Sequence, residues 1–198
     1  TMLSRTLPQC AALPWDAAVW PPTIHLGLFV HRVQGLIPGL YALVRNADKL
    51  HELKSRMNPR FQWKPAPSAP EKLPLYLLEE GDMQEISKNV SCDQDIAGEG
   101  CFSVAMLAEF EPTLLLRGPS FYRNLFWETG MIGQVLYLEA ESAGLRGTGI
   151  GCFFDDSAHR IFGLTDRTFQ SLYHFTVGGA DEDSRLTTLP AYPSENKL

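Results

Sequence analysis

The sequence predicts an α+β fold, on two observations. First, apolar runs of strand length, rich in strand formers, are separated by segments with helical spacing; the runs are IHLGLFVHRV at 24–33, LYALV at 40–44, LPLYLLE at 73–79 and CFSVAMLAEF at 101–110. Second, residues 120–142 place apolar side chains on nearly every face of one long helix, which is typical of a buried helix. Strands and helices mixed in this way indicate a sheet covered by helices. At 198 residues the chain fits one domain.

The first half of the chain begins with an arm and a hairpin. Four prolines and two tryptophans in residues 1–23 favour an extended arm. The runs at 24–33 and 40–44 are joined through a Pro-Gly turn, which predicts an antiparallel hairpin. Residues 46–57 predict a short amphipathic helix capped by Asn46 or Asp48. Five prolines between 59 and 74 predict a surface loop, which is the best candidate for a boundary or lid.

The second half predicts three helices and further strands. A helix is expected to start at Asp82, and the long helix is expected to stop at Gly144. Gly130 and Gly133 each cost about 1 kcal/mol of helix propensity, so we expect another backbone to pack closely on them. Asp156 or Ser157 is expected to cap a short helix that Gly163 ends. SLYHFTV at 171–177 reads as the last strand.

Charge and hydropathy narrow the class of protein. Seventeen basic and twenty-three acidic side chains give a net charge of -6, so nucleic acid is not an expected partner. The apolar stretches are shorter than the ~20 residues of a membrane helix, and the chain shows no apolar leader, so we expect a soluble cytoplasmic protein. The four cysteines form no CxxC pair, and they read as reduced thiols rather than zinc ligands.

The most unusual stretch is GLRGTGIGCFFDD at 144–156. It follows a helix and contains no GxGxxG pattern, so it does not predict a phosphate-binding loop. TGIGCF at 148–153 reads as a strand, and with Gly147 just before it the glycines at every second position, 147, 149 and 151, leave one face bare. Two interpretations stay open: the bare face packs against a neighbouring part of the protein, or it receives a flat ligand.

Few side chains indicate catalysis on their own. The histidines show no metal-binding spacing, no serine-hydrolase elbow is present, and no metal site is expected. Arg185 is a lone cation in the acidic stretch DEDSRL. It either forms a salt bridge with Asp181 or Asp183 or is reserved for an anion.

Several motifs together resemble a known family. They are ETGMIGQVLYLEAESAGLRGTGIGCFFDDSAHRIFGL, LYHFTVGG and DSRL, with HLGLFVHRVQGLIPGLYALVRNADKLHEL upstream. This order resembles the nitroreductase-like FMN flavoproteins, and within them the branch related to the SagB-type peptide-azoline dehydrogenases. The resemblance implies a nitroreductase-like fold, with a mostly antiparallel central sheet flanked by helices. The 120–142 helix would be its buried central helix, at or near a dimer face.

The resemblance also implies a function. Family members bind FMN, form a dimer or a tandem equivalent, and pass hydride from NADH, NADPH or a substrate through the flavin to a second substrate. Here that substrate would be a small molecule or a peptide. By position, Gly149, Ile150, Gly151 and Cys152 would lie near the reactive edge of the flavin, and Arg185 would bind its phosphate. No catalytic acid or base is identified.

A second hypothesis is a flavin-free or half-site domain that acts as a dimer or tandem partner or as a binding module. It arises because the arginine-rich motif with which most members open has no counterpart here; the chain shows LSRTLP and WPPTIHL instead. We accordingly divide the chain into an arm, residues 1–23, and a nitroreductase-like domain, residues 24–198. Because Thr1 precedes Met2, we keep open that the chain is a piece of a longer or tandem protein.

Overall fold

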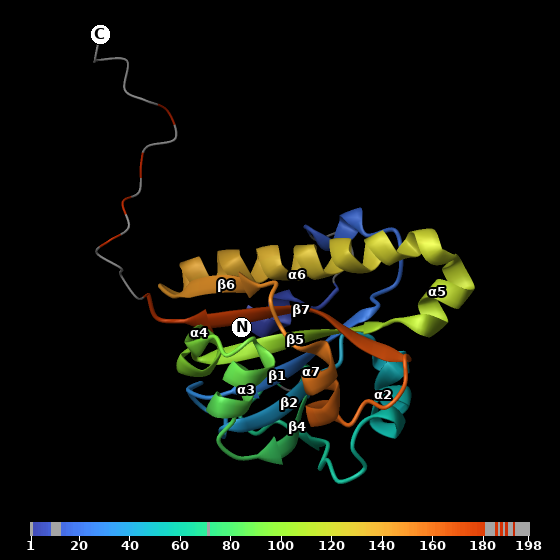
Figure 1. Cartoon of the computed structure of the whole chain (residues 1–198), viewed down its shortest axis with the longest axis horizontal. Helices are drawn as coiled ribbons and strands as arrows, with labels where there is room; N and C mark the ends of the chain where they lie inside the picture. Colours follow the sequence, from blue (N-terminus) through green and yellow to red (C-terminus); the bar gives the residue numbers. More distant parts are fainter. Residues whose placement is uncertain are drawn as a thin grey trace.

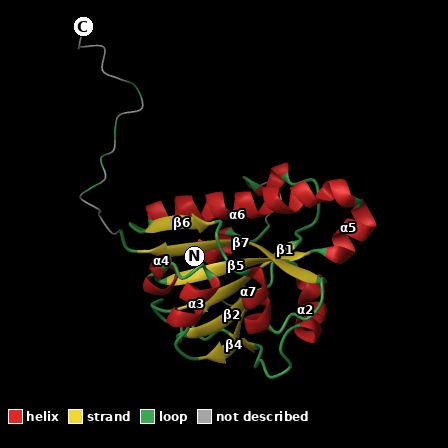
Figure 2. Ribbon diagram, in the orientation of Figure 1, coloured by secondary structure: helices red, strands yellow, loops and turns green. Residues whose placement is uncertain are grey.

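A seven-stranded antiparallel sheet forms the centre of the molecule (Figures 1 and 2). The computed structural model describes residues 2–8, 13–70 and 72–180 and the single positions 185, 187, 189 and 192. The strand order is β3-β4-β2-β1-β5-β7-β6, and each described pair is antiparallel. The strands are β1 (Ile24–Val30), β2 (Gly39–Leu43), β3 (Lys64–Pro65), β4 (Leu75–Glu80), β5 (Phe102–Glu109), β6 (Arg146–Ile150) and β7 (Phe169–Gly178). The predicted α+β class and mostly antiparallel sheet are confirmed.

Helices cover both faces of this sheet (Figure 1). They are α1 (Met2–Arg5), α2 (Leu50–Arg56), α3 (Gln84–Val90), α4 (Asp95–Glu99), α5 (Glu111–Arg117), α6 (Tyr122–Ser142) and α7 (Asp155–Phe162). Short 3-10 turns lie at Trp15–Ala17, Ala47–Lys49 and Pro119–Phe121. None of the described helices combines the length and the apolar character that crossing a lipid bilayer requires.

The first predicted hairpin and helix are present. β1 and β2 pair with Leu28 opposite Tyr41. The Asn46 side chain accepts a hydrogen bond from the Asp48 amide, and so caps the turn that leads into α2. The proline-rich segment is mostly loop, as expected, and contributes only the two-residue β3 at the sheet edge. Proline cannot donate a ladder hydrogen bond, and an edge strand tolerates it because one side of that strand has no neighbouring strand to bond.

Alternation along the strands builds two hydrophobic cores. Leu26 and Leu28 of β1 point to the core under α6, whereas Phe29 points to the core under α2, α3 and α7. Phe162 of α7 lies directly over Gly27 of β1, where any β-carbon would collide with its ring. The sheet is therefore buried on both faces, which explains why its strands read as nearly continuous apolar runs.

Helix α6 has its expected place over the sheet, but its burial is one-sided. Its buried side is formed by Leu125, Glu128, Thr129, Ile132, Gly133, Val135, Leu136 and Ala140. Its other side exposes large apolar side chains, among them Trp127 (55%) and Leu138 (61%). A helix that is apolar all round needs cover on every side, and in the described chain the sheet covers only one.

The close neighbour expected at Gly130 and Gly133 is absent from the described part of the chain. A β-carbon built on Gly130 meets nothing within 4 Å, and one on Gly133 meets only the Phe175 ring at 3.8 Å. The prediction of a backbone packed tightly on these glycines is wrong for this chain alone. The physical reason is that α6 turns this stripe toward an open groove.

Two local predictions are also corrected. The arm contains the helical turn α1 and a 3-10 turn, and Trp15 donates from Nε1 to the Arg5 carbonyl at 3.1 Å. Helix α7 begins at Asp155 after Phe154, without a side-chain cap from Asp156 or Ser157. Its end is as predicted, because Gly163 adopts the left-handed conformation with φ +73°.

Candidate functional site

Strand β6 lies at the edge of the sheet, paired only to β7 among the described strands. The strand predicted over TGIGCF ends at Ile150, so Gly151 and Cys152 belong to the loop between β6 and α7. We call residues 151–154 the β6–α7 loop. This placement matters because a loop, unlike a paired strand, can offer backbone groups to a ligand.

The alternate glycines of β6 make room for aromatic side chains of the same chain. A β-carbon on Gly147 would lie 2.8 Å from Cζ of Phe175, and one on Gly149 would collide with the Tyr173 hydroxyl. Tyr137 of α6 packs edge-on against Phe175 with ring centroids 4.8 Å apart, and its hydroxyl accepts the Gly149 amide hydrogen bond at 2.8 Å. Of the two interpretations left open by the sequence, internal packing accounts for the bare face at Gly147 and Gly149.

An open groove lies beside these aromatics, where the exposed and buried sides of α6 meet next to β7. It has a volume of about 310 Å³, and its walls are Phe126, Thr129, Gly130, Gly133, Gln134, Tyr137 and Tyr173. We call it the α6 groove. Two of these lining residues are glycines and three are aromatic, so the wall carries few aliphatic side chains. None of these lining residues is a cation.

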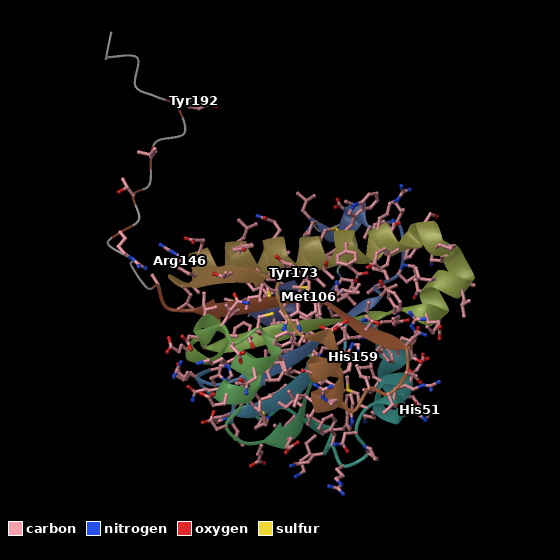
Figure 3. The ribbon with its side chains drawn as sticks, in the orientation of Figure 1. His51, Met106, Arg146, His159, Tyr173 and Tyr192 are labelled. Atoms are coloured by element: carbon pink, nitrogen blue, oxygen red, sulfur yellow. The ribbon has the colours of Figure 1, made fainter. Side chains whose placement is uncertain are left out.

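Tyr173, labelled in Figure 3, lines the α6 groove and also lies beside the β6–α7 loop. Its hydroxyl end lies beside Gly149 and its ring edge lies beside Gly151, where a built β-carbon would be 3.9 Å from Cε2. Gly151 and Cys152 are both exposed. The groove and the loop therefore form one open surface.

The five residues predicted to bind the cofactor are placed differently from one another. Gly149 is half-buried with its amide bonded to Tyr137, and Ile150 is buried at 2% exposure. Gly151 and Cys152 remain accessible in the loop. Arg185 lies in an exposed turn beyond β7; its alternative partners Asp181 and Asp183 fall outside the described residues. Its role toward a phosphate remains a prediction.

The sequence did not reveal Tyr137, Gln134 or Tyr173 as wall residues of the groove. Gly130 and Gly133 gave an indication, because glycine lowers helix stability and its presence in a helix suggests a close neighbour. Which side chains would surround that neighbour depends on how α6 crosses β7, and this crossing is a tertiary property.

The β6–α7 loop is held by contacts with α3 and β7. The Phe154 amide donates to the Val90 carbonyl at 2.8 Å, and Gln94 Nε2 donates to the Cys152 carbonyl at 3.0 Å. Phe153 stacks on His174 with ring centroids 4.4 Å apart. Burial lowers the pKa of His174 to about 4, so this imidazole is neutral at physiological pH. It supports the loop rather than supplying a charge.

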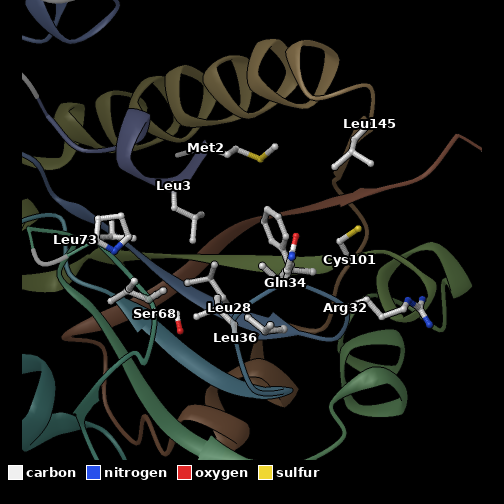
Figure 4. A pocket seen from close by; sticks show the side chains of 16 residues that line it. Met2, Leu3, Leu28, Arg32, Gln34, Leu36, Ser68, Leu73, Cys101 and Leu145 are labelled. Carbon is white, nitrogen blue, oxygen red and sulfur yellow. The ribbon is translucent and has the colours of Figure 1, made fainter.

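A second cavity lies on the same face of the sheet, between α1, residues 68–70, Leu73 and the strands (Figure 4). Its volume is about 350 Å³ and most of its walls are apolar, with Arg32 and Gln34 among the polar exceptions. No residue predicted to bind the cofactor lines it. Within the described residues, no group of three His, Cys, Asp or Glu side chains is arranged to hold a metal ion.

The fold and the groove define an α+β protein with a long helix over an antiparallel sheet and an open flat site at the sheet edge. The family model described as "Nitroreductase family" matches residues 41–179, and the chain belongs to that family. The comparison with curated proteins found no match.

Solved structures share the fold at low sequence identity. A protein from Anabaena variabilis assigned as a nitroreductase is 20% identical with a TM-score of 0.66, over 91% of this chain and 33% of that one. The Escherichia coli microcin synthetase McbBCD complex with truncated pro-MccB17 contains a chain that is 17% identical with a TM-score of 0.60, over 91% of this chain and 62% of that one. A Ralstonia eutropha protein assigned as a nitroreductase is 16% identical with a TM-score of 0.56, over 92% and 73%. The chain thus spans a third of the Anabaena chain and less than two thirds of the microcin synthetase chain.

Proposed function

We propose that this chain is an FMN-binding unit of an oxidoreductase, of the branch related to the SagB-type dehydrogenases. It would pass hydride from NADH, NADPH or a substrate through the flavin to a small-molecule or peptide substrate. Membership of the nitroreductase family supports the reaction class. The residues at the sheet edge supply the structural support.

One observation carries the proposal: exposed Gly151, the ring of Tyr173 and the glycine stripe of α6 form one open, flat surface. A planar aromatic ligand gains most from surfaces of this kind, because glycines allow close approach and tyrosine rings allow stacking. In the described chain no side chain or backbone atom fills the space above Gly130 to within 4 Å of a built β-carbon. The α6 groove therefore contains free space at Gly130 that a larger side chain would fill.

The residues that would hold FMN follow from their accessibility. The backbone of Gly151 and Cys152 would lie at the ring edge, and the exposed side chain of Gln134 in the α6 groove offers a polar group to it. Arg185 would pair with the phosphate through its planar guanidinium. The bound flavin would supply the hydride chemistry, and the protein its binding and orientation.

A second nitroreductase-like unit would complete the site. The α6 groove is at the small end of ligand pockets, which hold about 300–1,000 Å³, and none of its lining residues is a cation for a phosphate. Exposed apolar side chains flank it along α5 and α6: Leu115, Leu116, Tyr122, Phe126, Trp127 and Leu138. We propose that this α5–α6 apolar strip binds the second unit, as a homodimer or a tandem domain.

The alternative is a flavin-free half-site domain that serves only as a partner or binding module. The filling of the β6 glycine face by Phe175 and Tyr173 favours it, because that face offers no room for a ring. In this case the α6 groove would receive side chains of the partner instead of a cofactor.

FMN titration of the purified protein, followed by flavin fluorescence and thermal shift, tests the proposal. Gly130→Leu fills the α6 groove at an exposed position that nothing crowds, and it should weaken FMN binding tenfold or more. Gly179→Leu is the matched control, because a β-carbon there also meets nothing within 4 Å and the site lies elsewhere.

Equal FMN affinity of Gly130→Leu and the unmodified protein would contradict a role for the groove. Absence of FMN binding by the unmodified protein, both alone and with its second unit, would favour the flavin-free alternative. Arg185→Ala should weaken FMN but not riboflavin, since only FMN carries the phosphate.

A further inference from the structure

Two cysteines distant in sequence, Cys92 and Cys152, lie on loops that are hydrogen-bonded to each other. Cys92 lies between α3 and α4 and is half-buried, whereas Cys152 is exposed. The hydrogen bonds from Phe154 to Val90 and from Gln94 to Cys152 tie the two loops together on either side of the thiols. One backbone–backbone hydrogen bond and one side chain–backbone hydrogen bond therefore hold the two loops against each other.

The ionisation of Cys92 is consistent with this arrangement of the two loops. Hydrogen bonding to Cys152 is the largest cause that raises the pKa of Cys92 to about 11, followed by desolvation and the charge of Cys152. In a coupled pair of this kind, the second proton is hard to remove once the first has left. Cys92 thus remains a thiol at neutral pH, and the sulfur of the exposed Cys152 is the accessible one.

The backbone at Cys92 is unusual as well. Cys92 and Asp93 both adopt φ +56°, in the left-handed region that residues other than glycine seldom occupy. This conformation turns the chain sharply after α3, at the point where the loop meets Cys152.

We propose that Cys92 and Cys152 are a redox-active pair that forms a reversible disulfide in the folded protein. The disulfide would fasten the α3–α4 loop to the β6–α7 loop, which carries Gly151. It would give the protein an oxidised form in which this loop is covalently fixed and a reduced form in which hydrogen bonds alone hold it.

The oxidant in this proposal is a low-molecular-weight disulfide, such as oxidised glutathione. The Cys152 thiolate attacks one sulfur of the oxidant, forms a mixed disulfide and releases one glutathione thiolate. Cys92 loses its proton and attacks Sγ of Cys152, which forms the protein disulfide and releases the second glutathione. Two protein thiols lose two electrons and two protons, and the two glutathione molecules receive them.

Treatment of the reduced protein with oxidised glutathione, without flavin, tests the pair. A digest with trypsin and a protease that cuts before aspartate places Cys92, Cys101 and Cys152 in the separate peptides 89–92, 95–117 and 147–154. Mass spectrometry should find peptides 89–92 and 147–154 linked, with the loss of two hydrogen atoms. Dithiothreitol should separate them.

Matched serine variants complete the experiment. Cys101→Ser removes another half-buried cysteine and should leave the link intact, whereas Cys92→Ser should abolish it. Oxidation should raise the urea midpoint of the unmodified protein and of Cys101→Ser, and leave that of Cys92→Ser unchanged.

Three results would overturn the proposal: a link between other cysteines, a link only between chains, or a midpoint that oxidation does not raise. Because the measurement needs no flavin, a failure of the proposed FMN function would leave this result unaffected, and the reverse is also true.

Discussion

The buried carboxylate of Glu128 joins α6 to the start of β1 and the end of β2. It accepts hydrogen bonds from the Thr23 amide at 3.0 Å and the Thr23 hydroxyl at 2.7 Å, and it forms an ion pair with Arg45. Arg45 also donates to the Thr6 carbonyl at 2.6 Å and to the Ile24 carbonyl at 2.9 Å. The pair fixes the crossing of α6 over the sheet, and with it the position of the α6 groove.

Removal of one partner from this pair should be costly. Glu128→Ala leaves the Arg45 charge buried and unpaired, and we expect a loss of about 3–5 kcal/mol in the free energy of unfolding. Urea denaturation measures it. Glu139→Ala, which removes a half-exposed partner of Arg5, is the control and should cost no more than about 1 kcal/mol. Equal losses in the two variants would show that the buried pair is not structural.

Hydrogen bonds fix the tautomer of His25, and burial lowers the pKa of four histidines. At His25 the Arg45 amide donates to Nδ1 at 3.3 Å, so Nε2 carries the proton toward Glu109 at 3.2 Å. Burial lowers the pKa of His25, His31, His159 and His174, in the last case to about 4. The folded protein therefore takes up these protons less readily than the unfolded chain.

Stability should consequently fall in acid. The pKa of a histidine is about 6.5 in the unfolded chain and lower in the folded protein. At pH values between these two pKa values the unfolded chain binds more protons, so the free energy of unfolding decreases as the pH decreases. His174, which is fully buried, would account for up to about 3 kcal/mol of this loss between pH 6.5 and about 4. Urea titrations at several pH values measure the slope. His174→Gln should reduce it, whereas His51→Gln at an exposed site should not, and a slope unchanged in His174→Gln would refute this origin.

At the scale of elements, the packing of strand β6 against its neighbours depends on the absence of side chains at Gly147 and Gly149. Gly147 faces Phe175 so closely that a side chain must displace the ring, whereas Gly151, in the following loop, has space. We expect Gly147→Val to destabilise the protein by about 1–3 kcal/mol, and Gly151→Ala to change stability by less than about 0.5 kcal/mol. Urea denaturation gives both values, and amide hydrogen exchange shows whether the loss is confined to β6. A neutral Gly147→Val would mean that α6 and β6 are packed loosely.

At the scale of the whole molecule, the α5–α6 apolar strip exposes large apolar side chains to solvent. Leu115 and Leu116 of α5 are each 82% exposed, and Trp127 of α6 is 55% exposed. Several large exposed apolar side chains on two neighbouring helices are a feature of interaction sites. The groove and the strip are adjacent, so a partner on the strip would also close the groove.

Self-association is therefore expected, and it should depend on this strip. Trp127→Glu and Leu138→Glu should lower the sedimentation-equilibrium mass toward that of the monomer, because a buried unpaired charge disfavours the interface. Ile96→Glu in α4, at a similarly exposed apolar position, should leave the mass unchanged. A protein that is already monomeric would point to a tandem partner instead of a second copy.

The sequence alone determined the elements and the class. The runs at 24–33, 40–44 and 101–110 became β1, β2 and β5 because strand formers buried on both sheet faces leave a signal in every residue. Gly144 and Gly163 marked helix ends because both adopt positive φ, a local requirement that sequence can show. The motifs of the second half predicted the family that residues 41–179 match.

The tertiary structure alone decided what surrounds the glycines. Gly147, Gly149 and Gly151 look equivalent in sequence, yet Phe175 and Tyr173 fill the space beside the first two, and the third lies in an open loop. Similarly, Gly130 predicted a close neighbour and has open space instead. The difference between the three glycines depends on where the pairing of β6 with β7 ends. The space at Gly130 depends on how α6 crosses the sheet, which is set by contacts between residues far apart in the chain, such as Glu128 with Thr23 and Arg45. The glycines in the sequence indicate where space is required, and the packing of the folded chain determines which atoms occupy that space.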